Sequence, residues 1–296
     1  MLKKLPFNNP ILTASGTFGY ADEMSGFFEL SRLGGIIPKT VTLFPRPGNQ
    51  PPRTFETASG LLNSIGLDND GIDDFIVTKL SYLRTIGTKI IISVAIKNIE
   101  ECSIWGEKLQ KAEGINAIEL NVSCPNVSGG VDFATDPKLC ERIVSAFCKV
   151  INLPLFVKLS PNVFNIGEIA KGAEAGGAGG ISAVNTCLGL AVNWRTKKPQ
   201  LGNGFGGLSG PAIKPIALRC VRQIFKAVNI PIIGIGGIET IDDAMEFFVT
   251  GASAIQIGTA NFYNPTAAIK ILDALPDALT EIGAKNVTEI IGTLNC

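Results

Sequence analysis

The feature that most constrains the fold is a repeated alternation of short apolar runs with longer amphipathic stretches. The short runs are rich in β-branched residues, and some of them, such as IIISVAI, carry almost no polar side chain. Such runs are typical of strands in a parallel sheet that is covered on both faces. Eight strands are predicted in this way: Ile11–Ala14, Gly35–Thr40, Lys89–Ala95, Ala117–Val122, Leu155–Leu159, Gly180–Val184, Pro231–Ile235 and Ala254–Ile257.

The stretches between these strands carry the start signals of helices. Asp136 precedes Pro137, which suits a cap residue followed by proline at the first helical position. Thr240 and Asp243 have the spacing of a capping box, with Asp in place of Glu. Eight strands that alternate with helices predict an α/β fold, a (β/α)₈ TIM barrel with its active site at the C-terminal ends of the strands. An open, doubly wound sheet is the alternative. Since no linker or shift in composition is visible, residues 1–296 are expected to form a single domain.

The composition removes several classes of chemistry. The chain has no histidine, so the usual metal ligand and the usual general base are both missing. Its seven cysteines include no CxxC pair, so neither a metal site nor a disulfide framework is expected, and a cytoplasmic location fits best. The 26 basic residues balance the 26 acidic ones, which disfavours nucleic-acid binding. A membrane span is not expected either, because no apolar run reaches about 18 residues.

Three long insertions follow predicted strands at their carboxyl ends. They comprise residues 41–75, 123–135 and 186–210, after the second, fourth and sixth strands. In a parallel barrel all of these strand ends lie on one face, which is the face where barrel enzymes build their active sites. A functional site is therefore predicted on that face.

Polar residues and glycines also close nearly every predicted strand in the same register. The sequence places there Ser15-Gly16, Lys39-Thr40, Ser93, Asn121 followed by Cys124, Lys158-Leu159-Ser160, Asn185-Thr186, Gly236-Gly237 and Gly258-Thr259. One such residue is ordinary, but eight in one register indicate a shared ligand site. The glycines after the last two strands suit a phosphate cradle of backbone N–H groups, or else they only form tight turns.

Three side chains in this set point to chemistry. Lys39 and Lys158 each end a strand, where burial of a cation is costly without an anionic partner. Two lysines at one rim suit a flavin, whose reduced ring is an anion, although a structural salt bridge is the alternative for each. Cys124 lies in a predicted loop within NVSCPNVSGG (121–130), and in a chain without histidine it is the candidate general base. Packing is the alternative role for a lone cysteine.

Two further signals are interpreted as structural. The segment GNGFGG (202–207) matches a dinucleotide-binding pattern, but it does not follow a strand, so no nucleotide site is predicted there. The cysteines that fall within helical patterns are expected to be packing residues: Cys102, Cys140, Cys148 and Cys220.

Nine segments in order resemble the dihydroorotate dehydrogenases, and more narrowly their class 1B catalytic subunits. They are TASGTFGY (13–20), PKTVTLFPRPGNQPPR (38–53), LLNSIGL (61–67), NVSCPNVSGG (121–130), VKLSPN (157–162), VNTCLGL (184–190), GGLSGPAIKP (206–215), IGIGGI (233–238) and ASAIQIGTANF (252–262). The resemblance covers essentially the whole chain. It implies oxidation of dihydroorotate to orotate in pyrimidine biosynthesis, with the hydride passing to FMN and the proton to Cys124.

The resemblance also implies which residues bind each ligand. The expected FMN contacts are Ser15, Lys39, Thr40, Asn121, Lys158, Val184, Gly210, Gly236, Gly237, Gly258 and Thr259. The expected substrate contacts are Lys39, Asn63, Ser64, Ile65, Gly66, Leu67, Asn121, Asn185 and Thr186. Ser93 stands where the family usually has asparagine, so a flavin hydrogen bond there is expected to be shorter-reaching or mediated by water. The segment GLDNDG (66–71) also departs from the family's GLQNPG.

Partners follow from the resemblance as well. It implies a homodimer of catalytic chains at the core of a heterotetramer, whose second subunit carries FAD and a 2Fe-2S cluster and passes electrons to NAD⁺. The cysteines of this chain lack the close spacing of such a cluster. Two alternatives remain open at this stage: a class 1A-like, fumarate-using dihydroorotate dehydrogenase, and a barrel that binds a phosphorylated metabolite without redox chemistry.

Overall fold

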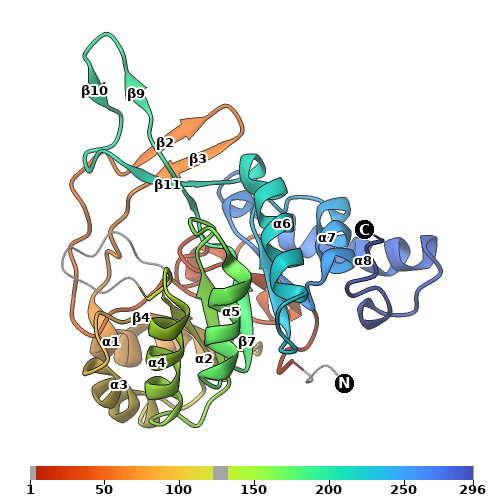
Figure 1. The fold of residues 1–296 in the computed structure, drawn as a ribbon, viewed down its shortest axis with the longest axis horizontal. Helices are drawn as coiled ribbons and strands as arrows, with labels where there is room; N and C mark the ends of the chain where they lie inside the picture. The colour runs from red at the N-terminus through yellow and green to blue at the C-terminus, as the bar shows by residue number, and fades with distance from the viewer. Residues whose placement is uncertain (1–4, 123–132, 296) are drawn as a thin grey trace.

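The main sheet of the protein is parallel and forms the wall of a barrel. The computed structural model describes residues 5–122 and 133–295. The sheet comprises β1 (Ile11–Thr13), β4 (Ile91–Ala95), β5 (Ala117–Asn121), β6 (Leu155–Leu159), β7 (Gly180–Ala183), β12 (Ile232–Ile235) and β13 (Ala254–Ile257). Their spatial order is β1-β13-β12-β7-β6-β5-β4, with parallel pairing throughout. Each of them lies within a predicted strand, and the barrel class is confirmed (Figure 1).

The segment 34–41 closes the barrel between its two edge strands. It makes three isolated parallel bridges, Leu12 with Gly35 on the β1 side and Ile36 with Ile90 and Val41 with Val94 on the β4 side. The open, doubly wound alternative is therefore wrong, because a doubly wound sheet leaves both edge strands without a common neighbour.

The prediction of a continuous strand at Gly35–Thr40 is only partly right. Pro38 has no N–H to donate to a ladder. The N–H of Ile37 instead donates to the Thr13 hydroxyl at 3.0 Å, and the N–H of Lys39 donates to the carbonyl of Gly19 at 3.0 Å. The middle of the segment thus bonds to side chain and loop, and the regular ladder is lost there.

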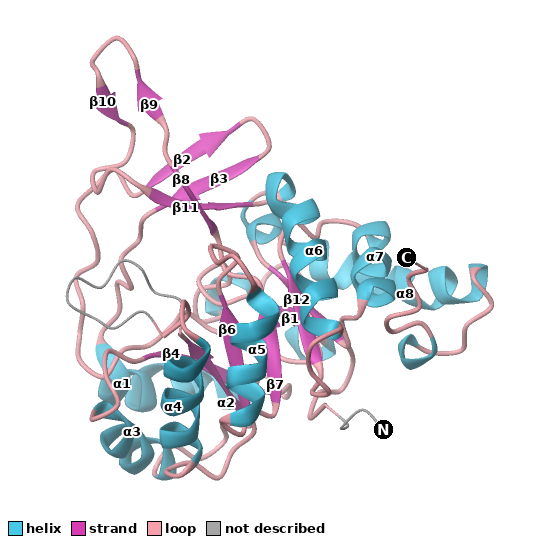
Figure 2. Ribbon diagram, in the orientation of Figure 1, coloured by secondary structure: helices cyan, strands magenta, loops and turns pink. Residues whose placement is uncertain are grey.

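Helices form the outer layer of the barrel (Figure 2). They are α1 (Gly71–Asp74), α2 (Leu80–Thr85), α3 (Glu101–Gln110), α4 (Pro137–Cys148), α5 (Ile166–Ala175), α6 (Lys214–Phe225), α7 (Ile241–Thr250) and α8 (Ala267–Glu281). A π-helical stretch, Phe75–Lys79, joins α1 to α2. After β1 the chain forms only short 3₁₀ turns, Asp22–Met24 and Leu30–Arg32.

The predicted helix starts are observed at the positions that the sequence indicated. The Asp136 carboxylate accepts the N–H groups of Lys138 and Leu139 at the start of α4. Thr240 and Asp243 form a reciprocal capping box at the start of α7. These bonds satisfy N–H groups that have no partner within the first turn of a helix, so they set where each helix begins relative to the barrel rim.

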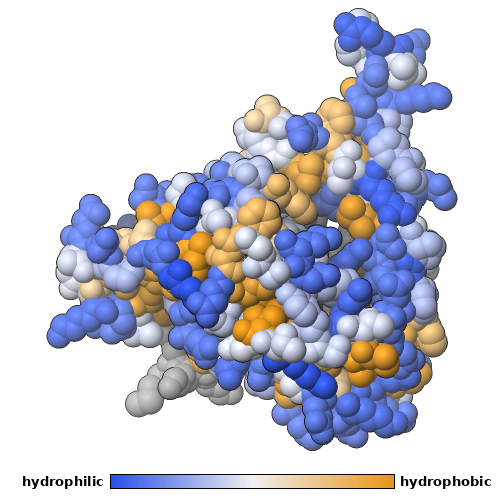
Figure 3. Space-filling model, turned by 180° about the vertical axis from the view of Figure 1, so that it is seen from behind, coloured by the Kyte–Doolittle hydropathy of each residue, from blue (hydrophilic) through white to orange (hydrophobic). Residues whose placement is uncertain are grey.

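Two of the predicted insertions build a second, antiparallel sheet beside the barrel. It consists of β2 (Thr54–Thr57), β3 (Gly60–Asn63), β11 (Gly206–Ser209) and β8 (Cys187–Gly189), in the order β2-β3-β11-β8. A hairpin of β9 (Val192–Asn193) and β10 (Lys198–Pro199) projects beyond it. Seen from behind, this hairpin stands clear of the body, and the face in view is mostly hydrophilic (Figure 3).

The interior of the barrel changes from apolar to polar along its axis. At the amino-terminal end, Leu12, Ile91 and Phe156 belong to a buried cluster that Phe7 covers, with its ring centroid 5.6 Å from that of Phe156. Alternate residues of a strand face the same side, so the next inward positions lie two residues further on. Most of these inward positions are polar and buried, namely Ser93, Glu119, Lys158, Ser182 and Gln256, whereas β1 and β12 contribute the apolar Ala14 and Ile235. The apolar end supports the fold, and the polar layer above it prepares the rim.

We expect that Thr13→Val will destabilise the closing seam of the barrel. Valine matches the shape of threonine but leaves the buried N–H of Ile37 without its acceptor, which costs about 1–3 kcal/mol. Urea unfolding followed by circular dichroism measures the change in midpoint. Thr13→Ser, which keeps the hydroxyl, is the matched control. A valine variant as stable as the parent would contradict this account of closure.

Candidate active site

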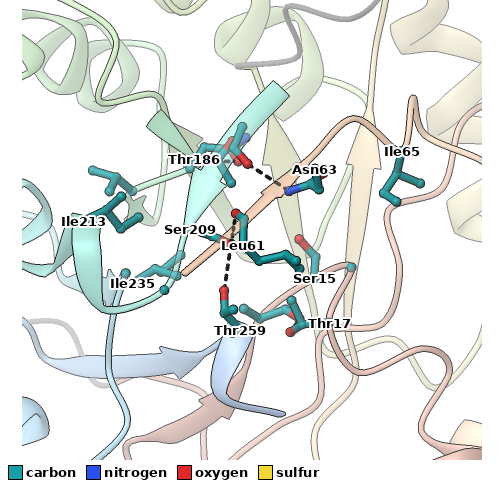
Figure 4. A pocket seen from close by; sticks show the side chains of 18 of the residues that line it. Ser15, Thr17, Leu61, Asn63, Ile65, Thr186, Ser209, Ile213, Ile235 and Thr259 are labelled. Atoms are coloured by element: carbon teal, nitrogen blue, oxygen red, sulfur yellow. Dashed lines mark hydrogen bonds between the residues drawn. The ribbon is translucent and has the colours of Figure 1, made fainter. Parts of the chain in front are cut away.

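A cavity of about 260 Å³ lies at the carboxyl ends of the barrel strands. Residues that end or directly follow the strands form one side of it, among them Ser15, Asn121 and Lys158. The second sheet forms another side through residues such as Asn63 and Ser209. Figure 4 shows Ser15 from the strand ends and Asn63 and Ser209 from the second sheet around one space. The insertions after the second and sixth strands thus contribute to a site on the predicted face.

The cavity wall contains most of the residues that the sequence singled out. From the expected cofactor set it includes Ser15, Lys39, Thr40, Asn121, Lys158, Val184, Gly210, Gly236, Gly237, Gly258 and Thr259. From the expected substrate set it includes Lys39, Asn63, Ile65, Gly66, Leu67, Asn121, Asn185 and Thr186. The fold therefore brings residues from the whole length of the chain to one place.

Two predicted contacts lie behind the wall. Ser93 is fully buried, and its hydroxyl lies 2.9 Å from the hydroxyl of Thr40, a residue that does line the cavity. Ser64 is also buried, and its hydroxyl accepts a hydrogen bond from the Asn49 amide at 2.8 Å. Both serines therefore support the wall from behind. Cys124 belongs to residues 123–132, which lie outside the described part of the chain.

Glycines form one corner of the cavity. Gly236 and Gly237 have φ angles of +127° and +72°, which favour glycine. A Cβ atom on Gly237 would come within 2.8 Å of the Lys214 Cβ and 2.9 Å of the Gly210 carbonyl oxygen. Within the described chain, the N–H groups of Gly236 and Gly237 donate no hydrogen bond. Bare N–H groups beside a cavity suit an anion such as a phosphate.

A side-chain bond ties this corner to the second sheet. The Thr259 hydroxyl, which follows β13, donates to the Ser209 hydroxyl of β11 at 2.8 Å (Figure 4). Gly207 of the same strand lies so close to Thr186 that a Cβ atom there would meet the Thr186 hydroxyl at 2.0 Å. Close packing of this kind fixes the position of the second sheet over the strand ends.

Lys158, on β6, lines the cavity from the barrel interior. It is only 5% exposed, its Nζ lies 3.5 Å from the Glu119 carboxylate, and it donates to the Ser15 hydroxyl at 3.2 Å. The salt bridge that the sequence left as an alternative for Lys158 is therefore present. Since Lys158 also lines the cavity, its ammonium is available to a bound anion as well.

Amide side chains occupy the space between these two ends. The Asn185 amide donates to the Asn121 carbonyl oxygen at 3.4 Å, which links the ends of β5 and β7. Asn63 donates to the backbone carbonyl of Gly207 at 3.3 Å. Each asparagine offers both a donor and an acceptor. The arrangement suits a planar ligand with amide groups of its own.

Several wall residues were not predicted as contacts. Asn162 bonds to Ser160, to the Thr186 carbonyl and to the Leu188 N–H, so it joins the loop after β6 to the third insertion. Its segment, VKLSPN, was already a noted motif. Glu239 follows the glycine corner and accepts a hydrogen bond from the Tyr263 hydroxyl. Burial raises the pKa of Glu239, and the charge of Asp243 raises it further, against the effect of Lys214.

Three of the described cysteines are buried packing residues. Cys102, Cys140 and Cys220 are buried within helices, as predicted. Burial raises the pKa of Cys102 and Cys220 to about 11 and that of Cys140 to about 12. These thiols therefore stay protonated near neutral pH and serve as packing groups.

Two classes of site receive no support from the described residues. No cluster of three or more His, Cys, Asp or Glu side chains among them has the arrangement of a metal site. In the same part of the chain, no helix has both the length and the apolar character that crossing a bilayer requires. The segment GNGFGG (202–207) runs into β11 of the antiparallel sheet, so the strand–turn–helix context of a dinucleotide site is missing there.

The fold and the site define a class: a (β/α)₈ barrel whose rim cavity combines a glycine corner suited to an anionic group with amide side chains suited to a planar ligand. A family model described as dihydroorotate dehydrogenase matches residues 1–279, and the chain belongs to this family.

Relatives and a solved structure agree with this assignment. Proteins named dihydroorotate dehydrogenase B (NAD(+)), catalytic subunit, from Alkaliphilus oremlandii and Bacteroides fragilis are each 48% identical to the chain, covering 98% of it and 96% of their own length. The namesake from Desulforamulus reducens is 46% identical over 98% of the chain and 95% of its own length. A crystal structure of DHODH from Eimeria tenella, in complex with ferulenol, has a TM-score of 0.82 at 24% identity, covering 99% of this chain and 87% of its own. That structure supports the fold.

We expect that the stability contributed by the hydrogen bonds of Asp243, beside the glycine corner, depends on pH. Burial alone would raise the pKa of Asp243, but hydrogen bonds from Lys214 and from the groups of Glu239 and Thr240 hold it below its ordinary value. A depressed carboxyl pKa stabilises the fold above the unfolded value, about 3.9, and this stabilisation is lost as the pH falls through the lower folded value.

Asp243→Asn tests this expectation through urea midpoints at neutral and acidic pH. The variant should be less stable than the parent near pH 7 by about 1.5–3 kcal/mol, the usual contribution of a hydrogen bond to a charged group. The deficit should shrink as the pH falls below about 4, because the unfolded carboxyl is protonated first and the folded one follows at its lower pKa. Asp242→Asn, at an exposed position next to it, is the control. A deficit that is constant over this range would refute the role of the charge.

Proposed function

We propose that this chain oxidises dihydroorotate to orotate with FMN bound in the rim cavity, as the catalytic subunit of an NAD⁺-linked enzyme of pyrimidine biosynthesis. The observation that carries the proposal is the joint lining of one cavity by the glycine corner, the two rim lysines and the asparagines Asn63, Asn121 and Asn185. The names of the relatives give the same reaction class and the same electron acceptor. Residues 1–296 act in this proposal as one FMN-binding domain.

The residues present fit FMN. The corner at Gly236 and Gly237 leaves backbone N–H groups for the phosphate and has no room for a Cβ atom on Gly237. At the other end, the buried ammonium of Lys158 stabilises negative charge on the reduced ring. Thr40, held from behind by Ser93, contributes its hydroxyl to the wall between them. When bound, FMN supplies the acceptor for the hydride that dihydroorotate loses.

The asparagines and Lys39 bind the substrate. A pyrimidine ring with amide groups needs donors and acceptors in its plane, which Asn63, Asn121 and Asn185 provide. The substrate also carries a carboxylate, and the Lys39 ammonium pairs with it at the rim. Leu67, which has a φ angle of +59°, belongs to the loop that completes this part of the wall.

Cys124 takes the proton that leaves C5 of dihydroorotate. It lies three residues after Asn121, which ends β5 and lines the cavity. A thiol with an unperturbed pKa of about 8.5 is a usable base near neutral pH. Burial makes Cys102, Cys140 and Cys220 far weaker acids than this, so they supply little thiolate.

Replacing Cys124 separates proton removal from cofactor binding. Cys124→Ala is expected to keep bound FMN but to slow flavin reduction by dihydroorotate by about 10²–10⁴-fold, the usual contribution of a general base. Cys124→Ser is expected to be little better near pH 7, because a hydroxyl is a much weaker base than a thiolate. Anaerobic stopped-flow absorbance measures the rate. An alanine variant as fast as the parent would rule out Cys124 as the base, and Cys148→Ala is the control for loss of a thiol elsewhere.

A partner subunit carries the electrons onward. In the proposal, two catalytic chains form the central dimer of a heterotetramer, and the second subunit holds FAD and a 2Fe-2S cluster, in the cytoplasm. The cysteines of this chain are too far apart in sequence to hold such a cluster. The described chain also lacks a strand–turn–helix unit at its one GxGxxG match.

We therefore expect that the purified single chain reduces artificial dyes with dihydroorotate but gains NAD⁺ reduction only with the partner subunit. A steady-state assay with dihydroorotate and either dye, NAD⁺ or fumarate measures both activities. Vigorous NADH formation by the chain alone would refute the need for a partner. Stimulation by fumarate would favour the class 1A-like alternative, and neither result would affect the assignment of Cys124.

A further inference from the structure

We propose that Glu119 is a positioning residue that holds the ammonium of Lys158 and offsets part of its charge, and so lowers the midpoint potential of the bound flavin. The inference rests on the proposed function, since it concerns FMN in the rim cavity. It follows from the placement of Glu119 in the barrel interior, from its contacts and from the orientation of Gln256.

Glu119 occupies the middle of β5, directly below the cavity. Its neighbours on the same side of the strand are Ala117, which belongs to the buried apolar cluster, and Asn121, which lines the cavity. Because alternate residues share a face of the strand, Glu119 projects into the barrel between them. It is fully buried, with an exposed fraction of 0%. A carboxyl group in this position is cut off from solvent and depends on its protein partners.

Three partners surround the carboxylate, of which two lie on other strands and one, Ser15, lies just after β1. The Nζ atom of Lys158 lies 3.5 Å from Oε1, and the Ser15 hydroxyl donates to the same oxygen at 3.4 Å. The Gln256 amide donates to Oε2 at 2.7 Å. β13, which carries Gln256, does not neighbour β5 in the sheet, so this bond crosses the interior of the barrel. Lys158 also donates to Ser15 at 3.2 Å, which completes a closed group.

The orientation of Gln256 suits an ionised Glu119. Its Nε2 faces Glu119 and also lies 3.5 Å from the Ser182 hydroxyl, whereas its buried Oε1 has no hydrogen-bond partner. The amide thus offers its donor to Glu119, which is what an ionised carboxylate accepts. Burial of such a charge is tolerable only with a cation and donors beside it, and Lys158 supplies the cation.

The consequence for the flavin follows from the charges. The Lys158 ammonium stabilises the anionic reduced ring, but a carboxylate 3.5 Å away offsets part of that effect. Removing the charge of Glu119 while keeping its shape therefore favours the reduced flavin and raises the potential. A role in packing alone predicts no change of this sign.

The test is a spectroelectrochemical titration of the FMN-loaded parent and variants. Glu119→Gln should shift the two-electron equilibrium toward the reduced flavin by about tenfold, which corresponds to an upward shift of about 30 mV. Ser182→Ala is the matched control, because it alters a neutral side chain of the same buried layer and should leave the potential unchanged. An unchanged or lowered potential in Glu119→Gln would overturn the inference.

A double variant tests whether Glu119 acts through Lys158. In a Lys158→Met background no ammonium remains for Glu119 to hold or to offset. Glu119→Gln is therefore expected to have no effect on the potential in a Lys158→Met background. A shift there as large as in the parent would show that Glu119 acts on the flavin directly, against the proposal.

A measurement on stable proteins covers the case in which Glu119→Gln does not fold. Infrared difference spectra between oxidised and reduced protein should show the band of an ionised carboxylate and no band of a protonated carboxyl group. The carboxylate band should shift in frequency in Glu119→Asp, which assigns it to this residue. A protonated signal at this residue would overturn the inference. A parent protein that takes up no FMN would contradict the proposed function itself, whereas normal FMN binding with an unchanged potential in Glu119→Gln contradicts only the role of Glu119.

Discussion

In a closed parallel barrel, every strand delivers its last residues to the same rim and its alternate residues to the same interior. Here the closure depends on the segment 34–41, whose bridges to Leu12, Ile90 and Val94 join the two edges of the sheet. Without that closure, Lys39 would not face the cavity that Lys158 enters from the other side of the barrel. The glycine corner, the asparagines and the interior polar layer all take their positions from this shared register.

The barrel interior has two layers with different roles. The apolar layer around Leu12 and Phe156 is closed off by Phe7 and gives the sheet a packed core. The layer above it is polar: the buried Glu119 carboxylate contacts the Lys158 ammonium and accepts a hydrogen bond from the Gln256 amide. The carboxylate needs both of these partners, because it is cut off from water. A buried ionic group of this kind is a poor source of stability compared with apolar packing. Its position directly beneath the rim cavity is explained by function, because a charge there acts on whatever binds above.

Much of the fold was predictable from the sequence because its signals are local. Apolar runs marked seven strands correctly, and Asp136 and Thr240 marked helix starts through bonds to residues within one turn. The remaining predicted strand, Gly35–Thr40, forms only isolated bridges. The effect of Pro38 on the ladder depends on where the neighbouring N–H groups find acceptors, which the sequence does not show. The rim residues were predictable as well, since strand ends in one register meet at one edge. Their roles as ligand contacts remain proposals.

What the sequence did not show depends on contacts between distant residues. Nothing near Glu119 in the chain indicates that Gln256 reaches it across the barrel interior. In the same way, the sequence did not show that the hydroxyl of Ser93 lies 2.9 Å from that of Thr40; its expected contact with the cofactor stays a prediction. The four-stranded sheet beside the cavity pairs β3 with β11 over a long span of sequence, so its insertions were visible but their pairing was not.

The central claim is that dihydroorotate delivers its electrons to FMN at this rim. The most direct measurement is an anaerobic titration of the purified, FMN-loaded chain with dihydroorotate, followed by the visible absorbance of the flavin. The account predicts a yellow protein with one FMN per chain whose absorbance bleaches as dihydroorotate is added, with orotate formed in equal amount. A colourless protein that takes up no FMN, or a bound flavin that stays oxidised in excess dihydroorotate, would contradict it.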